Sequence, residues 1–153
     1  MKAKVLILVL CLSVAALAAT HSDWSGSWQF SPEKSKNIGM MAQMKMIQTV
    51  EQSDSSLDVT THIQGRGEDS KTHYDLTGKP ATNESPMGGP SETVTKWDGA
   101  KLVTTWTSES AIAGGPKVVR IETRSVSADG KTMTVESVRG SNSAVVMVFE
   151  KKP

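Results

Sequence analysis

The sequence predicts an all-β fold, an antiparallel up-and-down β-barrel of eight to ten strands. From residue 43 onward Thr, Val and Ser dominate, and apolar residues alternate with polar ones in short runs. Turn residues separate these runs at the spacing of about 8–12 residues that is typical of antiparallel sandwiches and barrels. No stretch of ten residues carries the apolar stripe of an amphipathic helix.

The first 18 residues have the features of a secretory signal. Lys2 and Lys4 precede an apolar run at residues 5–14, and Ala16-Leu17-Ala18 fits the small-x-small rule for signal peptidase. The apolar run is shorter than the roughly 20 residues that a membrane helix needs, so we expect no membrane span. We therefore expect cleavage after Ala18 and a secreted or periplasmic product, with residues 19–153 forming a single barrel domain.

The charge and cysteine content exclude several classes of protein. Cys11 is the only cysteine and would leave with the signal, so no disulfide would stabilise the product. The chain has 17 basic and 16 acidic residues, and loss of Lys2 and Lys4 would leave 15 basic residues without a basic stripe. Nucleic acid is therefore excluded as a partner. A chain without disulfides also favours a closed barrel, because closure removes aggregation-prone sheet edges. The oligomeric state is left open.

The expected elements follow one another along the chain. An opening strand at residues 25–30 leads into a helical turn at residues 31–39, with Ser31 as its cap and Gly39 at its end. Asp98-Gly99 and Asp129-Gly130 predict two tight hairpins, because glycine accepts a positive φ. The remaining strands are expected at residues 44–52, 57–63, 71–76, 92–97, 101–109, 117–127, 131–138 and 144–150.

One long segment is predicted to have no regular structure. Residues 78–91 contain three prolines and three glycines, which are typical of a loop. A loop of this length is usually mobile or functional.

Two late strands differ in the distribution of their apolar residues. In residues 117–127, Arg120, Glu122 and Arg124 share one face, while the other face carries Val119 and Ile121. We expect the arginine face to lie in water, which would leave Arg120 and Arg124 unable to act as an internal anion clamp. Residues 144–150 are apolar on both faces, as expected of a strand that is covered on both sides or that closes a barrel seam.

Gly26-Ser27-Trp28 resembles the G-x-W motif of lipocalins and their calycin relatives. The resemblance implies that Trp28 plugs the closed end of the barrel and that a late basic residue, Arg139 or Lys151, packs over its ring. The stretches "SGSWQFSPEKS", "VSADGKTMTV" and "VFEK" also resemble a group of small secreted bacterial proteins with lipocalin-like barrels and no assigned activity.

The chain departs from these families in three respects. It lacks the lipocalin cysteine pair, and no residues remain after Glu150 for the long C-terminal lipocalin helix. Fatty-acid-binding proteins share the opening glycine-tryptophan strand. They place a helix-turn-helix lid between their first two strands, and residues 31–42 are too few for it.

The resemblance implies a non-catalytic protein that binds a small, mainly apolar molecule inside the barrel. Residues 39–46, which contain four of the eight methionines, and residues 78–91 would form the rim. The expected wall residues are Met44, Met46, Trp106 and Met133.

Two other functions remain open. Thioethers select soft metals, so Met40, Met41, Met44 and Met46 would suit copper in a periplasmic protein, with His62 as a nitrogen ligand. A barrel filled by its own side chains would instead be a structural or interaction module. The sequence contains no catalytic set and no cofactor-binding motif, so we expect neither enzyme activity nor a cofactor.

Overall fold

The computed structural model describes residues 21–86 and 88–153. They form ten antiparallel strands in one sheet and two short 3-10 helices. The strands are β1 (Gly26–Phe30), β2 (Met46–Gln52), β3 (Ser56–Ile63), β4 (Ser70–Asp75), β5 (Ala81–Glu84), β6 (Pro90–Asp98), β7 (Lys101–Ser108), β8 (Val118–Val126), β9 (Thr132–Arg139) and β10 (Val145–Lys151). The helices are η1 (Pro32–Lys34) and η2 (Gly39–Gln43). The predicted signal lies outside the described residues.

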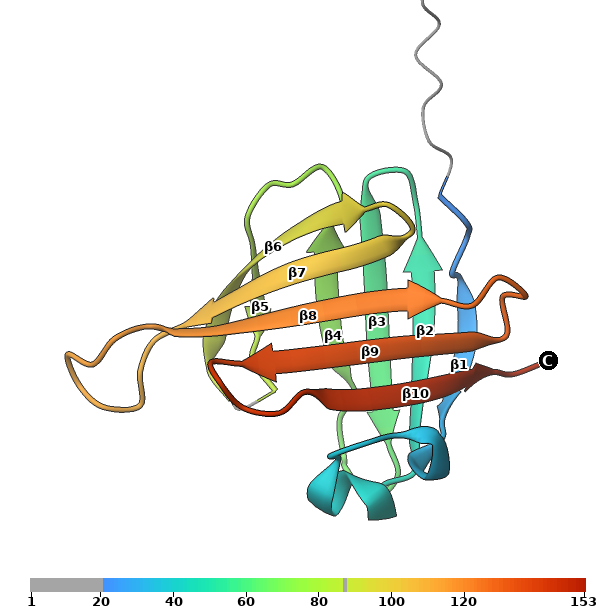
Figure 1. The fold of residues 1–153 in the computed structure, drawn as a ribbon, viewed down its shortest axis with the longest axis horizontal. Coiled ribbons are helices and arrows are strands. Elements are labelled where there is room, and N and C mark those ends of the chain that lie inside the picture. Colours follow the sequence, from blue (N-terminus) through green and yellow to red (C-terminus); the bar gives the residue numbers. More distant parts are fainter. Residues whose placement is uncertain (1–20, 87) are drawn as a thin grey trace, which may run out of the picture.

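The sheet curls into a nearly closed up-and-down barrel, as the sequence predicts. Its strand order is β4-β3-β2-β1-β10-β9-β8-β7-β6-β5, so β1 and β10 pair and join the two ends of the chain. Strands β2 to β4 cross behind strands β7 to β10 in Figure 1, and the two layers enclose the core. The sheet ends at β4 and β5, which lie side by side without forming a strand pair.

One end of the barrel is closed by tryptophans. Trp28 is fully buried, and its indole N–H donates to the carbonyl of Trp24 at 3.0 Å. The Lys151 ammonium lies 5.2 Å from the centre of the Trp28 ring. Gly26 has a φ of 130°, a backbone conformation that other residues rarely adopt, so the motif needs glycine at this position. Of the two basic residues expected over Trp28, Lys151 lies there. Arg139 is exposed at the end of β9 and pairs with Arg120, so its expected role is wrong.

Residues 31–45 cover part of the other end of the barrel (Figure 1). The predicted helical turn is η1, but the Ser31 side chain makes no capping hydrogen bond to it. Gly39 begins η2 rather than ending the first turn. Lys36 pairs with Val146, and the Ser31 backbone N–H donates to Val148. This cover explains why β10 is apolar on both faces.

The predicted loop at residues 78–91 is wrong, because it contains β5 and the start of β6. Its prolines occupy positions that a strand tolerates: Pro80 precedes β5, and Pro90 is the first residue of β6. Gly88 and Gly89 have positive φ and form the turn between the strands. The prolines and glycines therefore delimit two short strands.

The predicted orientation of β8 is also wrong. Glu122 and Arg124 are buried, whereas Val119 and Ile121 are among the exposed large apolar residues. Arg124 pairs with Val135 of β9, which is buried, and paired residues share a face of the sheet. The arginine face therefore points into the barrel.

Among residues 21–86 and 88–153, no helix has the length and apolar character needed to cross a membrane.

Candidate functional site in the barrel interior

A cluster of polar and charged side chains crosses the middle of the barrel. Arg120, Glu122 and Arg124 reach into it from β8, and Gln48 and Tyr74 reach into it from β2 and β4. Arg124 donates to the Gln48 side-chain oxygen at 3.0 Å, and the Tyr74 hydroxyl donates to Glu122 at 2.8 Å. These hydrogen bonds connect strands that are far apart in the sheet order.

Glu122 bridges the two arginines. One carboxylate oxygen accepts from Arg120 at 3.2 Å, and the other accepts from Arg124 at 3.4 Å and from Tyr74. The side chains of Glu122 and Arg124 are only 7% and 4% exposed, whereas that of Arg120 is 17% exposed. Arg120 is therefore the member of the cluster nearest to solvent.

Arg120 also rests on an aromatic ring. Its guanidinium lies 4.4 Å from the centre of the Trp106 ring, a favourable cation–π contact. The same guanidinium donates to the Ser137 hydroxyl at 3.2 Å. The cation–π contact with Trp106, together with the bonds to Glu122 and Ser137, holds this side chain at the edge of the cluster.

Burial changes the titration of the cluster. It raises the pKa of the Tyr74 phenol well above its ordinary value, and the nearby Glu122 carboxylate raises it further. Burial opposes the charged form of Arg124, but Tyr74 and Glu122 outweigh it and raise the pKa of that guanidinium. Tyr74 is therefore a neutral hydrogen-bond donor, and Arg124 a permanent cation.

Three buried donors in this cluster have no acceptor. Among the side chains that the structure describes, they are the indole Nε1 of Trp106, Nη2 of Arg120 and Nε of Arg124. Buried polar atoms without a partner are costly and are rare in folded proteins. Because all three are donors, and two of them belong to guanidiniums, the cluster is suited to receive an acceptor with negative charge.

The rest of the interior is divided into an apolar part and a hydroxyl-lined part. Large apolar side chains fill the region bounded by β1, β2, β3, β9 and β10, among them Phe30, Val50, Leu57, Val135 and Phe149. Strands β6 and β7 instead bury a row of hydroxyls: Ser91, Thr93, Thr95 and Thr104. The interior is thus amphipathic, with the charged cluster between its two parts.

Three of the four predicted wall residues belong to the buried core. Met46, Trp106 and Met133 all face inward, and the Met133 sulfur accepts from Arg124 at 3.4 Å. Met44 differs, because β2 begins two residues later and Met44 ends η2 in a half-buried position. Their role in binding a ligand stays a prediction.

The proposed methionine–histidine metal set does not converge. Met46 faces inward, opposite Ile63, whereas His62 is the neighbouring residue and points outward. Met40 is 89% exposed. His62 instead bonds to Asp69 at 2.7 Å on the outer surface. In the described part of the chain, no three His, Cys, Asp or Glu side chains gather where a metal ion would bind.

Sequence reasoning missed most of the cluster. Tyr74 and Gln48 were not singled out, and Arg120 and Arg124 were placed on the wrong face. A usable signal lay in the Asp129-Gly130 hairpin. A two-residue turn there pairs Val126 with Met133 and Arg124 with Val135, as observed, and so places the arginine on the apolar face of β9.

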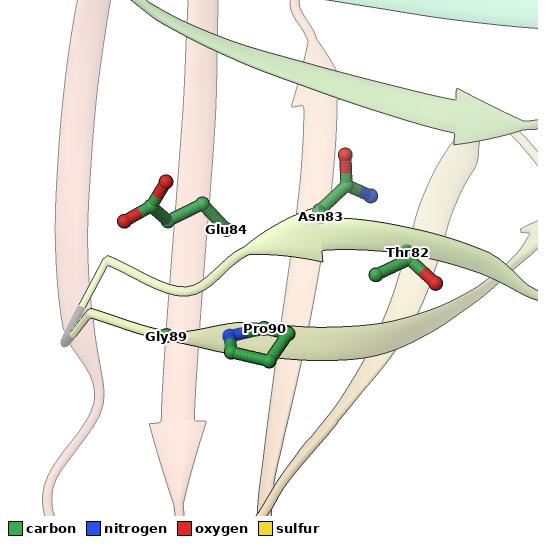
Figure 2. A pocket seen from close by; sticks show the side chains of 5 residues that line it. All are labelled: Thr82, Asn83, Glu84, Gly89 and Pro90. Atoms are coloured by element: carbon green, nitrogen blue, oxygen red, sulfur yellow. The ribbon is translucent and has the colours of Figure 1, made fainter.

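Asn83 is a further residue that sequence reasoning missed. Its side-chain oxygen accepts from the His73 backbone N–H, and its amide nitrogen donates to the His73 carbonyl, both at 2.8 Å. The amide thus replaces the missing backbone pairing between β4 and β5. Figure 2 shows it pointing from β5 toward the neighbouring strand. No sequence signal identifies this role, since an asparagine between prolines and glycines is typical of a turn.

A surface hollow of about 380 Å³ lies at the β5–β6 hairpin (Figure 2). None of the predicted wall residues and none of the cluster residues lines it. Its lining residues are Thr82, Asn83, Glu84, Gly89 and Pro90.

No protein-family model and no curated protein matches the chain. Solved structures do match it. A protein described as REP1-NXSQ fatty acid transporter aligns with a TM-score of 0.65 and 15% identity, over 84% of this chain and 96% of that one. Fatty-acid-binding protein 1 of Echinococcus granulosus aligns with a TM-score of 0.66 and 10% identity, over 84% and 97%.

These alignments show a shared fold. Residues 31–42, all of which the structure describes, hold no helix-turn-helix lid, as expected from their small number. Two short 3-10 helices, η1 and η2, lie between the first two strands, where that family carries its helix-turn-helix. The chain shares its nearly closed antiparallel barrel, which has ten strands, with these two structures.

Proposed function

We propose that this protein binds, without catalysis, a small molecule with an apolar body and an anionic head group inside the barrel. The observation that carries this proposal is the set of three buried donors without acceptors, on Trp106, Arg120 and Arg124. A carboxylate or similar head group would accept from them and would offset the positive charge of the arginines.

The location of the cluster supports entry from the end opposite the tryptophans. Arg120 lies close to the start of β8, and its partial exposure gives the head group a route from solvent. Ile38, Ile63 and Met147 are partly buried against the core and would contact the apolar body. Methionine, which is unbranched and has three rotatable side-chain bonds, adapts well to flexible aliphatic chains.

The structural neighbours support the same class of ligand. Both are described as proteins that transport or bind fatty acids, which consist of an apolar chain and a carboxylate. An apolar chain with a carboxylate matches the chemical character of the side chains that this barrel buries.

We also propose that the protein is exported and that it resembles the small secreted bacterial barrels named above. The charged start, apolar run and Ala16-Leu17-Ala18 site support this proposal. N-terminal sequencing of the protein recovered from its native compartment would find residue 19 first. Recovery of the intact chain from the cytoplasm would contradict export.

The binding proposal is tested by thermal unfolding with decanoate, decanol and decane-1-sulfonate. A ligand that binds only the folded state increases the free energy of unfolding and therefore raises Tm. The increase is about 2.7 kcal/mol when the free ligand concentration is a hundred times Kd. We expect both anions to raise Tm more than decanol. Arg120→Gln should reduce this difference, whereas Arg66→Gln, the same change on an exposed loop, should preserve it.

Two outcomes would contradict the proposal. An unchanged Tm with all three compounds would favour a barrel filled by its own side chains. Equal stabilisation by decanol and by the anions would show that the donors of the cluster do not select the ligand.

A further inference from the structure

Glu122 already occupies part of the anion-binding cluster. Its carboxylate takes one donor from Arg120, one from Arg124 and the hydroxyl of Tyr74. It is thus a built-in counter-ion, supplied by the same strand as the two arginines. The donors left unpaired are other atoms of the same guanidiniums and the Trp106 indole.

The net charge of the buried cluster follows from this arrangement, since Arg139, which pairs with Arg120, and Lys151, which lies over Trp28, are exposed and stand outside it. Among the described residues, the charged side chains in the cluster are the cations Arg120 and Arg124 and the anion Glu122. Their sum is one positive charge. In a site of low dielectric, a buried charge is stable only when it is paired, so the head group that completes the cluster carries one negative charge.

We infer that Glu122 is a specificity-determining residue that restricts the ligand to monoanionic head groups, such as carboxylates, sulfates and sulfonates, and excludes dianionic phosphate monoesters. This inference rests on the proposed function, since it specifies the head group of the same ligand. It follows from charge, because a dianion would leave the cluster with a net negative charge and would face the Glu122 carboxylate across the shared guanidiniums.

Decyl sulfate and decyl phosphate separate charge from shape. Both have the same chain and a tetrahedral head group. At a pH of about 8.5 the sulfate is a monoanion and the phosphate a dianion, because the second pKa of a phosphate monoester is about 6. We expect the protein to bind decyl sulfate at least about tenfold more tightly than decyl phosphate by isothermal titration, well below the micelle concentration of either.

Glu122→Gln tests the cause of this preference. The substitution keeps the shape of the side chain and changes the interior charge from one positive to two. The preference for sulfate over phosphate should then fall by about tenfold or reverse. Glu136→Gln is the matched control, because Glu136 is exposed on β9 and loses the same charge outside the barrel. It should keep the preference of the unmodified protein.

Arg120→Gln provides a second variant in case Glu122→Gln does not fold. It lowers the interior charge to zero at the most exposed member of the cluster, and it should weaken binding of decyl sulfate relative to decanol. Far-UV circular dichroism and the melting curve of each variant report whether the barrel is intact.

The outcomes separate this inference from the proposed function. If neither decyl anion binds the unmodified protein, the proposed function fails. If both anions bind with equal affinity, or if Glu122→Gln folds and keeps the preference for sulfate, the role of Glu122 is overturned while binding of an anion stands. If Arg120→Gln retains the full preference for sulfate over decanol, the charge count is overturned as well.

Discussion

Tyr74 and Glu122 form the shortest hydrogen bond of the internal cluster, at 2.8 Å, from opposite parts of the sheet. Arg124 donates to both residues. Buried ion pairs of this kind are costly to desolvate, and hydrophobic replacements often stabilise a protein more. The cluster also leaves three donors unpaired, which adds to its energetic cost. Costly arrangements of this kind are expected at functional sites.

Tyr74 gives a titration that reports on the cluster directly, because it is the only tyrosine in the chain. The pKa of Tyr74 is raised in the folded protein. The neutral phenol therefore contributes its full stabilisation to the fold at pH values below the ordinary phenol pKa, near 10, and this stabilisation decreases as the pH rises above that value. We expect tyrosinate absorbance to appear only when the chain unfolds at alkaline pH, and Tyr74→Phe to abolish it.

One outcome of this titration would contradict the burial of Tyr74. Reversible tyrosinate formation near the ordinary phenol pKa, with circular dichroism of the native barrel unchanged, would place Tyr74 in contact with water. It would thereby contradict the buried hydrogen bond to Glu122.

Single residues show what sequence patterns predict well and poorly. Trp28 and Lys151 lie where the G-x-W resemblance places them, because a glycine-tryptophan pair at the head of a strand is a local signal. Arg120 and Arg124 were misplaced because hydrophobicity alone assigns arginines to water. The face of the sheet on which Arg124 lies follows from its pairing with Val135 across the Asp129-Gly130 hairpin, and the sequence of β8 alone does not contain this information.

At the level of the strands, β4 and β5 form the weak point of the barrel. They end the sheet, and the Asn83 side chain supplies hydrogen bonds between them. It also donates to the Thr93 hydroxyl, so one buried amide connects β4, β5 and β6. Asn83 thereby provides side-chain hydrogen bonds across the seam where the sheet ends.

Replacement of Asn83 by leucine, which has a similar volume, should open this seam. It removes three hydrogen bonds, one of them buried and two partly buried, and leaves the His73 backbone groups unpaired, which should lower the free energy of unfolding by about 1–3 kcal/mol in urea titrations. Hydrogen exchange of the His73 amide should accelerate. Asn142→Leu, on the exposed β9–β10 turn, is the matched control. Equal stability of the two variants would show that Asn83 does not hold the seam.

Strand positions were largely predictable, and the β5–β6 hairpin was the exception. Alternation and the two Asp-Gly turns place most strands within a few residues of their observed ends. The segment at residues 78–91 was misassigned because its prolines and glycines are turn formers wherever they occur. Here they fall at strand ends, and the hydrogen bonds that make β5 a strand come from β6, in the next part of the chain.

For the whole molecule, the sequence predicts the up-and-down barrel correctly, although the sheet is only nearly closed, but it does not predict the amphipathic interior. Closure follows from the number, spacing and alternation of the strands, which are properties of short segments. The internal cluster depends on residues of β2, β4 and β8 meeting across the barrel, and only the assembled fold brings them together.

The most direct test of an internal anion site is the indole N–H spectrum of the protein, recorded by two-dimensional NMR during titration with decanoate. The chain has four tryptophans. The indole N–H groups of Trp24 and Trp28 already donate within the protein, to Ser22 and to the Trp24 carbonyl, whereas that of Trp106 has no acceptor. Binding at the cluster therefore predicts a saturable downfield shift of the Trp106 resonance, assigned with Trp106→Phe, at one decanoate per chain, with Trp24 and Trp28 unchanged. A Trp106 resonance that stays in place while decanoate binds, or no binding at all, would contradict the account.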